Sequence, residues 1–406
     1  MSARWRQRVV GGIAVVVVAL TMAIPIAVAA PSDGFYENVP SNLGSLQPGH
    51  LIKYEVETDF LPALTHEAAA YRVMYRSTGQ LGQAVAVTGM VFVPQGSPPA
   101  GGWPIVAWNH GTSGVGDQCA PSRWPDLYTG DSWDVYLTQV DRLLAEGYLV
   151  TATDYEGLGT PGLHPYLQTD SLGRAVIDGV RAARELAGDL VPAVPTQTRW
   201  AAIGHSEGGQ AAIGAGELAA GYSQGLTLVG AAAYAPSQHI ELGIEAMSAL
   251  PTTAPYLAYF AVGMKSINAN FNYANFVGPI YRNRMGDAEE HCFDEWFGPD
   301  NQGVIPTPLT ALNPLWLLDP TVRRWISNLQ VGQRRGAAPV FVMQGGLDLL
   351  VVTYGLFVNE ICRTGTPVDG QVYPLSDHDA VVDQAWPDAR NWLRDRFAGV
   401  PPSSGC

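Results

Sequence analysis

Residues 200–209 have the sequence WAAIGHSEGG, in which a short apolar run leads into a G-x-S-x-G pattern. A helix rich in small residues is expected soon after it, over 210–220. A strand, this pattern and a helix in that order predict a nucleophile elbow, a tight turn that lifts Ser206 above the strand. Gly204 and Gly208 suit such a turn because they have no Cβ atom to keep strand and helix apart. The pattern alone recurs by chance, so the flanking strand and helix make it specific.

Strand and helix patterns alternate on both sides of Ser206. Short apolar runs rich in β-branched or small residues predict strands at 84–93, 104–108, 148–153, 199–204, 339–343 and 371–375, and 226–234 is a further apolar run. Apolar residues at helical spacing predict helices at 135–146, 172–186, 354–363 and 380–397. This alternation predicts an α/β fold, with a mostly parallel, doubly wound sheet covered by helices on both faces.

One segment, 239–335, breaks this alternation, because it is rich in aromatic residues, asparagine and proline. We interpret it as a largely helical cap insertion over one end of the sheet. The chain then divides into a signal peptide at 1–30, a first part of the core at 31–238, the cap at 239–335 and a second part of the core at 336–406. Aromatic residues of the cap either line a binding site or form the cap's own core, and the sequence leaves both open.

The first thirty residues resemble an export signal. Three arginines, Arg4, Arg6 and Arg8, precede an uncharged apolar run, and small residues at Ala27 and Ala29 suit a signal peptidase. We expect cleavage near Ala29 or Ala30. The alternative is an uncleaved anchor, since an apolar run of this length is enough to span a bilayer. Both alternatives predict a protein that works outside the cytoplasm, and the first predicts a secreted one.

Composition excludes several kinds of partner. The 406 residues include 37 acidic and 23 basic ones, and the net charge of −14 disfavours nucleic acid as a partner.

A G-x-G-x-x-G pattern at 157–162 resembles a dinucleotide-binding loop. However, Pro161 and Pro165 delay the following helix, whose N-terminus would have to meet the pyrophosphate. We therefore expect no dinucleotide, and nothing in the sequence implies an obligate protein partner.

The four cysteines are Cys119, Cys292, Cys362 and Cys406. Their even number and the expected oxidising compartment predict two disulfides, although the residues alone allow three pairings. A metal site is the weaker interpretation because the spacing of metal-binding motifs is absent from the sequence. We expect neither a metal nor a cofactor.

Ser206 needs a base and an acid, which follow it in the order acid, histidine in this type of fold. His378 follows the predicted strand 371–375 and precedes the last helix, whereas His239 and His291 lie too early in the chain. The alternative for His378 is a loop histidine held by a neighbouring aspartate. Asp348 follows strand 339–343 and is the predicted acid. The alternative acids are Asp319, Asp369 and Asp377.

Acyl transfer also needs donors for the oxyanion. The backbone N–H of Glu207, directly after the nucleophile, is the first candidate. The second candidate comes from the loop of His110, Gly111 and Thr112, which follows strand 104–108. Gly111 lets the backbone approach a substrate oxygen. The alternative is an ordinary turn, and the sequence does not decide which N–H points inward.

In combination, these residues resemble the secretory lipase family of α/β-hydrolases, the yeast lipase-A type and its actinobacterial relatives. The resemblance covers nearly the whole mature chain and is carried by YRS (75–77), WNHGTSG (108–114), CAPS (119–122), TDYEG (153–157), GHSEG (204–208) and the Asp348 and His378 loops. It implies a Ser206–Asp348–His378 triad, a cap over an acyl tunnel, and disulfides Cys119–Cys292 and Cys362–Cys406. The chain departs from the yeast pattern at His110, where the resemblance implies an acidic residue.

The expected function is that of a secreted, serine-dependent carboxylic ester hydrolase. We expect a lipase that forms an acyl-enzyme with acylglycerols or other fatty acyl esters, presented at a lipid–water interface. One alternative is a hydrolase of the same fold for short soluble esters or peptides. Another is a non-catalytic binding protein on this scaffold, although the complete set of Ser206, Asp348 and His378 disfavours it.

Overall fold

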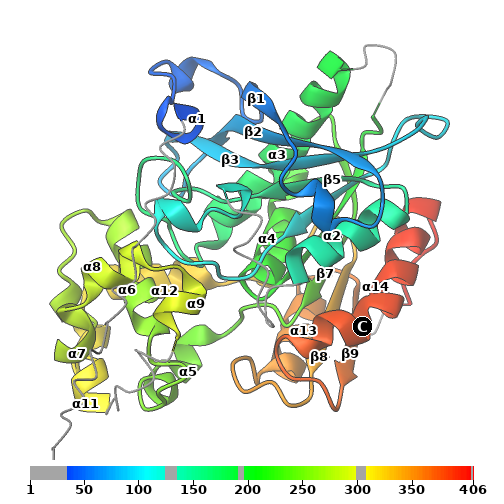
Figure 1. Cartoon of the computed structure of the whole chain (residues 1–406). Coiled ribbons are helices and arrows are strands. Elements are labelled where there is room, and N and C mark those ends of the chain that lie inside the picture. Colours follow the sequence, from blue (N-terminus) through cyan, green and yellow to red (C-terminus); the bar gives the residue numbers. More distant parts are fainter. Residues whose placement is uncertain (1–33, 124–134, 191–195, 299–307, 404–405) are drawn as a thin grey trace, which may run out of the picture. The chain divides into compact units, whose positions relative to one another are not determined.

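A nine-stranded sheet organises the part of the chain that the computed structural model describes, which is residues 34–123, 135–190, 196–298, 308–403 and 406 (Figure 1). Its strands are β1 (Leu51–Glu57), β2 (Ala68–Thr78), β3 (Ala84–Pro94), β4 (Ile105–Asn109), β5 (Leu149–Thr153), β6 (Arg199–His205), β7 (Thr227–Tyr234), β8 (Val340–Gly345) and β9 (Val368–Tyr373). The signal peptide expected at 1–30 lies outside the described residues. No helix among those that are described is long and apolar enough to cross a membrane.

The strand order is β1-β2-β3-β5-β4-β6-β7-β8-β9. Strands β5, β4, β6, β7, β8 and β9 pair in parallel, whereas β1, β2 and β3 pair antiparallel and β3 joins β5 antiparallel. The expected mostly parallel, doubly wound α/β sheet is therefore confirmed. Parallel strands bring their carboxyl ends to one edge of the sheet, and Asn109, His205 and Gly345 all end their strands there.

Helices cover both faces of this sheet. They are α2 (Val135–Ala145), α3 (Thr169–Leu190), α4 (Glu207–Tyr222), α13 (Tyr354–Arg363) and α14 (Ala380–Ala398), and the short α1 (Gly34–Glu37) precedes the first strand. Successive side chains of β6 point to opposite faces of the sheet and so belong to two different hydrophobic cores. Trp200 and Ala202 pack against α3 and α4, whereas Ala201 and Ile203 belong to the core beneath α2 and α14. Figure 1 shows α2 and α14 together on one face.

Two predicted boundaries need correction. Helix α4 begins at Glu207 rather than at 210, because the elbow passes directly into the helix. Strand β9 is Val368–Tyr373 rather than 371–375, since its pairing with β8 starts at Val368. Strands β1 and β2 were also not predicted; in the edge strand β1 the apolar side chains of Tyr54 and Val56 are exposed.

Between β7 and β8 the described residues form mainly helices and turns. The helices described there are α5 (Ile240–Met247), α6 (Tyr256–Ile267), α7 (Pro279–Arg282), α8 (Met285–Glu290), α9 (Phe293–Trp296), α11 (Pro308–Ala311) and α12 (Pro320–Leu329). They enclose a core of their own that includes Tyr259, Phe260, Trp296 and Trp325. Phe271 and Phe276 are also buried in this core, so most of the aromatic residues of the segment serve packing.

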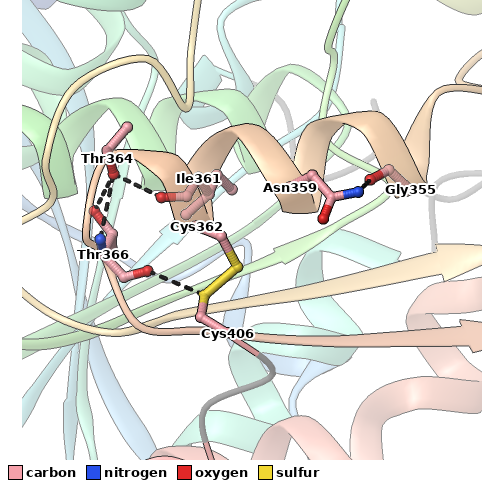
Figure 2. Close-up of a disulfide and its surroundings, with 7 residues drawn as sticks. All are labelled: Gly355, Asn359, Ile361, Cys362, Thr364, Thr366 and Cys406. Carbon is pink, nitrogen blue, oxygen red and sulfur yellow. Dashed lines mark hydrogen bonds between the residues drawn. A yellow bond between two sulfur atoms is a disulfide. The ribbon is translucent and has the colours of Figure 1, made fainter.

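Two disulfides are present, Cys119–Cys292 and Cys362–Cys406. They are the two pairs that the family resemblance implies. The first joins the loop after β4 to the start of α9, and the second joins the end of α13 to the C-terminal residue (Figure 2). The backbone carbonyl of Thr366 also lies 3.7 Å from Sγ of Cys406.

Candidate active site

Ser206 occupies a strained turn between β6 and α4, with φ 55° and ψ −116°. A serine rarely adopts positive φ, because its Cβ then crowds the backbone. Two backbone hydrogen bonds hold it there. Its N–H donates to the carbonyl of Tyr234 at 2.9 Å, and its carbonyl accepts from the N–H of Ser237 at 3.0 Å. The turn that the G-x-S-x-G pattern predicts is thus anchored on the neighbouring strand β7.

The two glycines of the pattern are required by close backbone approach. A Cβ on Gly204 would lie 2.2 Å from the carbonyl oxygen of Gly208, and a Cβ on Gly208 would lie 1.9 Å from that of Asn109. Neither distance is compatible with a carbon atom, and the obstructing atoms belong to the backbone. The absence of side chains at these two positions therefore lets α4 start directly on β6 and β4.

Hydrogen bonds link Ser206 to His378 and His378 to Asp348, pairs that lie 172 and 30 residues apart along the chain. Oγ of Ser206 is 3.0 Å from Nε2 of His378, and Nδ1 of His378 is 2.8 Å from Oδ2 of Asp348. Asp348 is itself held by three donors, the N–H groups of Leu350 and Val351 and the Nε2 of Gln344, at 2.8 to 3.0 Å. These distances are those of a nucleophile, a base and an orienting acid.

The alternatives weighed from the sequence have other partners. Asp369 accepts from Trp392, Asp377 accepts from two backbone N–H groups at the start of α14, and Asp319 caps α12. His239 contacts Glu360, and His291 contacts Glu295 at the surface. None of these five side chains has a hydrogen bond to Ser206 in the described part of the structure.

The electrostatics of the group favour the protonated form of His378. Burial alone would lower the pKa of His378, but the hydrogen bond and the negative charge of Asp348 outweigh it and raise that pKa above 6.5. In turn, burial of Asp348 is outweighed by its hydrogen bond to His378 and by the charge of that residue, so its pKa is lowered. Asp348 therefore remains ionised beside Nδ1 of His378.

The loop after β4 lies against the elbow. A Cβ on Gly111 would be 3.3 Å from Nδ1 of His205 and 3.6 Å from Cβ of Ser206. His110 turns its buried side chain inward, and burial lowers its pKa to about 3, so the ring is neutral. The hydroxyl of Tyr155 donates to the His110 carbonyl at 2.9 Å, and Oγ1 of Thr112 lies 2.7 Å from the hydroxyl of Tyr166. Tyr155 and Tyr166 thus fix this loop beside Ser206.

Two adjoining cavities reach Ser206 and His378. The first is lined by the loop after β4 and by aromatic side chains, among them Trp108, Tyr136, Tyr256, Phe293 and Phe297. The second has a more aliphatic lining, which includes Leu167, Ile240, Met247, Phe260 and Val351. Tyr256 and Leu350 border both cavities. The sequence does not distinguish Tyr256 from the other aromatic residues of segment 239–335, because its contact with the site depends on how α6 packs.

Within the described residues, His205, His378 and Asp379 are the group whose side chains could converge on a metal ion. However, Nε2 of His205 is 2.9 Å from the carbonyl oxygen of His378, and both ring nitrogens of His378 have hydrogen-bond partners. A metal ion would have to break these contacts. We therefore assign the group to the hydrogen-bonded site and not to a metal centre. His205 is a site residue that sequence reasoning missed, although its place directly before the nucleophile was a signal.

The sheet order, the elbow after β6 and the hydrogen-bonded serine define the protein as an α/β-hydrolase. A family model described as "Secretory lipase" matches residues 129–405, and the chain belongs to this family. Members of the family are lipase or esterase hydrolases, so this activity class is supported for the chain.

Curated relatives agree with this assignment. The chain is 25% identical over 388 residues to a probable inactive lipase of Mycobacterium tuberculosis, a match that covers 91% of this chain and 83% of the relative. It is 23% identical over 421 residues to lipase A of Arthroderma benhamiae, with coverage of 95% and 84%.

Solved structures agree on the fold. Lipase A of Candida antarctica in its closed state superposes with a TM-score of 0.76 at 19% identity, covering 94% of this chain and 89% of that one. The rice cell wall degrading esterase LipA of Xanthomonas oryzae superposes with a TM-score of 0.66 at 19% identity, covering 87% and 97%. At these identities the likeness shows the fold, and it confirms the predicted α/β-hydrolase class.

Proposed function

We propose that this protein is an exported, serine-dependent hydrolase of carboxylic esters, with Ser206 as nucleophile, His378 as base and Asp348 as the orienting acid. The observation that carries this proposal is the hydrogen-bonded series from Oγ of Ser206 through His378 to Asp348, beside a cavity with a mainly apolar lining. Membership in the secretory lipase family supports the same reaction class and an extracellular location.

The proposed reaction begins with proton transfer. Nε2 of His378 takes the hydroxyl proton of Ser206 while Oγ attacks the ester carbonyl carbon, and the carbonyl oxygen becomes an oxyanion. Asp348 keeps Nδ1 of His378 protonated and stabilises the imidazolium. His378 then gives its proton to the leaving alcohol, which departs and leaves an acyl-Ser206 ester. Water, deprotonated by His378, attacks this ester and releases the acid and free Ser206.

The oxyanion is stabilised by backbone donors in this proposal. The first is the N–H of Glu207, the first residue of α4, where the helix dipole also favours negative charge. The second is an N–H of the loop of His110, Gly111 and Thr112, where a Cβ on Gly111 would lie 3.6 Å from Cβ of Ser206. Loss of one such donor costs about 10²–10³ in rate in other enzymes.

A lipid substrate is supported by the surroundings of the site. We propose that the helical segment expected at 239–335 acts as a cap, since Tyr256, Phe293 and Phe297 from it border the cavity at Ser206. Leu347, Leu349 and Leu375 are 57%, 88% and 90% exposed. They lie in the loops of Asp348 and His378, which are joined by a hydrogen bond from Leu347 N–H to Ser376. Exposed leucines on neighbouring loops suit contact with a lipid phase.

The test is a panel of p-nitrophenyl esters from C2 to C16 and an emulsified triglyceride, with Ser206→Ala as the control. Serine-dependent turnover of long chains and of the emulsion supports a lipase. Turnover confined to short chains contradicts the lipid substrate but keeps the ester hydrolase. No turnover by the folded protein contradicts the proposed activity.

A second set of variants separates the exposed leucines from the chemistry. Leu349→Glu combined with Leu375→Glu is expected to reduce emulsion turnover about tenfold and to leave soluble C4 ester turnover intact. Leu81→Glu is the matched control, since Leu81 is 52% exposed and follows β2, six strands from β8 in the sheet. Equal emulsion turnover by both variants would exclude a role for the leucines.

A further inference from the structure

A buried histidine and a buried glutamate meet beside the elbow, and the proposed reaction does not use their side chains. Nε2 of His164 lies 3.0 Å from Oε1 of Glu207. The two side chains are 0% and 1% exposed. Glu207 is the residue whose backbone N–H is the proposed oxyanion donor, and the charge of its carboxyl group also acts on Tyr256, which lines the cavity at Ser206.

The glycine-rich loop at 157–162 brings His164 to this place. Gly157 has φ +72°, and a Cβ there would lie 2.6 Å from the backbone nitrogen of His164. The loop can therefore fold back on itself only with glycine at 157. Nδ1 of His164 then comes within 2.7 Å of the carbonyl oxygen of Glu156. The pattern that resembles a dinucleotide motif thus serves to position a histidine.

Hydrogen-bond chemistry fixes the number of protons in the pair. The Glu156 carbonyl only accepts hydrogen bonds, so Nδ1 of His164 must carry a proton. One further proton lies between Nε2 of His164 and Oε1 of Glu207, because two acceptors 3.0 Å apart would repel. Whether this proton is on the imidazole or on the carboxyl, the pair has no net charge.

The groups around the pair are neutral or engaged elsewhere. Burial lowers the pKa of His110 to about 3, so His110 adds no positive charge. Burial, followed by the Glu207 charge, raises the pKa of Tyr155 and Tyr166 well above 10, and Tyr256 is raised likewise by burial and by Asp379 and Glu207. The Glu156 carboxyl, whose pKa burial raises, is held by Ser171 and Gln80. Oε2 of Glu207 has no hydrogen-bond partner among the described residues.

We propose that His164 is a positioning residue that keeps Glu207 in a neutral pair and so protects the oxyanion site from an uncompensated negative charge. This inference rests on the proposed function. Without His164, an ionised Glu207 would leave a buried negative charge near the cavity in which the oxyanion develops, and like charges repel strongly in a medium of low dielectric. Protonation of Glu207 would remove this repulsion, so the effect depends on pH.

The test compares kcat of His164→Gln with that of the wild type from pH 5 to 9 on a soluble C4 ester. The ratio of variant to wild type is expected to fall as pH rises, to about one tenth or less at the alkaline end, with KM unchanged. Adding Glu207→Gln removes the charge of the carboxylate. The double variant is expected to have a higher kcat than His164→Gln at pH 9, and its kcat relative to the wild type is expected not to change with pH. His239→Gln is the control, because His239 pairs with Glu360 at 2.8 Å in a comparable but separate contact.

A flat ratio for His164→Gln, or a double variant no faster than the single one, would overturn the proposal. The Tm of the same proteins gives a reading that is independent of activity, since an unpaired buried carboxylate also destabilises the fold. The Tm deficit of His164→Gln is expected to grow as pH rises and to vanish with Glu207→Gln. A wild type without esterase activity would contradict the proposed function, whereas a Tm deficit that does not depend on pH would contradict the neutral pair.

Discussion

The backbone carbonyl of His378 accepts a hydrogen bond from Nε2 of His205 at 2.9 Å, so the residue before the proposed nucleophile holds the proposed base. The two imidazole rings are also in contact, with centroids 4.9 Å apart. Burial and the charge of His378 lower the pKa of His205 to about 4. His205 is therefore neutral, and it joins the elbow to the His378 loop without adding a positive charge.

This contact predicts a specific effect of substitution. His205→Phe retains a ring of similar size but lacks the donor, and kcat on a soluble ester is expected to fall about five- to tenfold with KM unchanged. His205→Gln can still donate from a similar position and is expected to recover most of the loss. Steady-state kinetics of the two variants measure this. A loss of kcat in His205→Gln as large as that in His205→Phe would contradict the role of the hydrogen bond.

The raised pKa of His378 predicts the acid limb of the pH–rate profile. A general base must be neutral, so kcat/KM rises as pH increases through the pKa of His378 in the free enzyme. Because that pKa is raised, the midpoint of the limb is expected above pH 6.5. A midpoint below that value would contradict the influence of Asp348.

Asp348→Asn tests the origin of this shift. Without the carboxylate the pKa of His378 falls, so the acid limb moves to lower pH. The rate falls too, by about 10⁴-fold in the comparable serine protease variant, because an amide can favour the wrong imidazole tautomer. The pH–rate profile of Asp348→Asn gives both readings. An unchanged midpoint would argue that another group sets the limb.

Gly208 predicts a stability effect that follows from sterics alone. A Cβ at this position would lie 1.9 Å from the backbone oxygen of Asn109, so Gly208→Ala is expected to cost about 3 kcal/mol or more in the free energy of unfolding. Gly221→Ala is the control in the same helix, since no atom lies within 4 Å of a Cβ there. That change is expected to stabilise by about 0.5–1 kcal/mol. Denaturant unfolding measures the free energy of unfolding of both variants. Similar changes in the two would contradict the close approach of Gly208 to the backbone of Asn109.

The two disulfides are expected to differ in their effect on activity. Cys119→Ser/Cys292→Ser and Cys362→Ser/Cys406→Ser each remove a crosslink and are expected to cost about 2–5 kcal/mol of stability. Of the two disulfides, only Cys119–Cys292 adjoins the cavity. Phe293, the residue after Cys292, lines the cavity, and its backbone N–H donates to the carbonyl of Ser113 at 2.9 Å. We expect kcat/KM on a soluble ester to fall severalfold in the first variant and to stay unchanged in the second, below their melting temperatures.

Much of the fold was predictable because local pattern and chain order agree. The apolar runs around Ser206 alternate with helices, and in a parallel sheet this order places the ends of β6 and β8 at one edge. Asp348 follows β8 and His378 follows β9, and both strands end at that edge of the sheet. The proximity of these two residues to Ser206 therefore follows from the topology. The family resemblance, now confirmed, rests on the same motifs.

Other features depend on contacts that leave no local signal. Strand β1 was not predicted, and it departs from the usual pattern because Tyr54 and Val56 are exposed while Glu57 is buried, as an edge strand permits. The approach of Tyr256 to Ser206 depends on how α6 packs over the sheet. His164 meets Glu207 across 43 residues through a backbone reversal at Gly157, and sequence spacing does not show such a reversal.

The most direct test of the proposed function is covalent labelling with p-nitrophenyl hexylphosphonate, followed by intact mass and peptide mapping. An activated serine displaces p-nitrophenol and retains the phosphonyl group. We predict one adduct per protein, located on Ser206, with loss of esterase activity in parallel and no adduct on folded Ser206→Ala or on the unfolded wild type. Labelling at another residue, or undiminished labelling and turnover in Ser206→Ala, would contradict the assignment of Ser206 as the nucleophile.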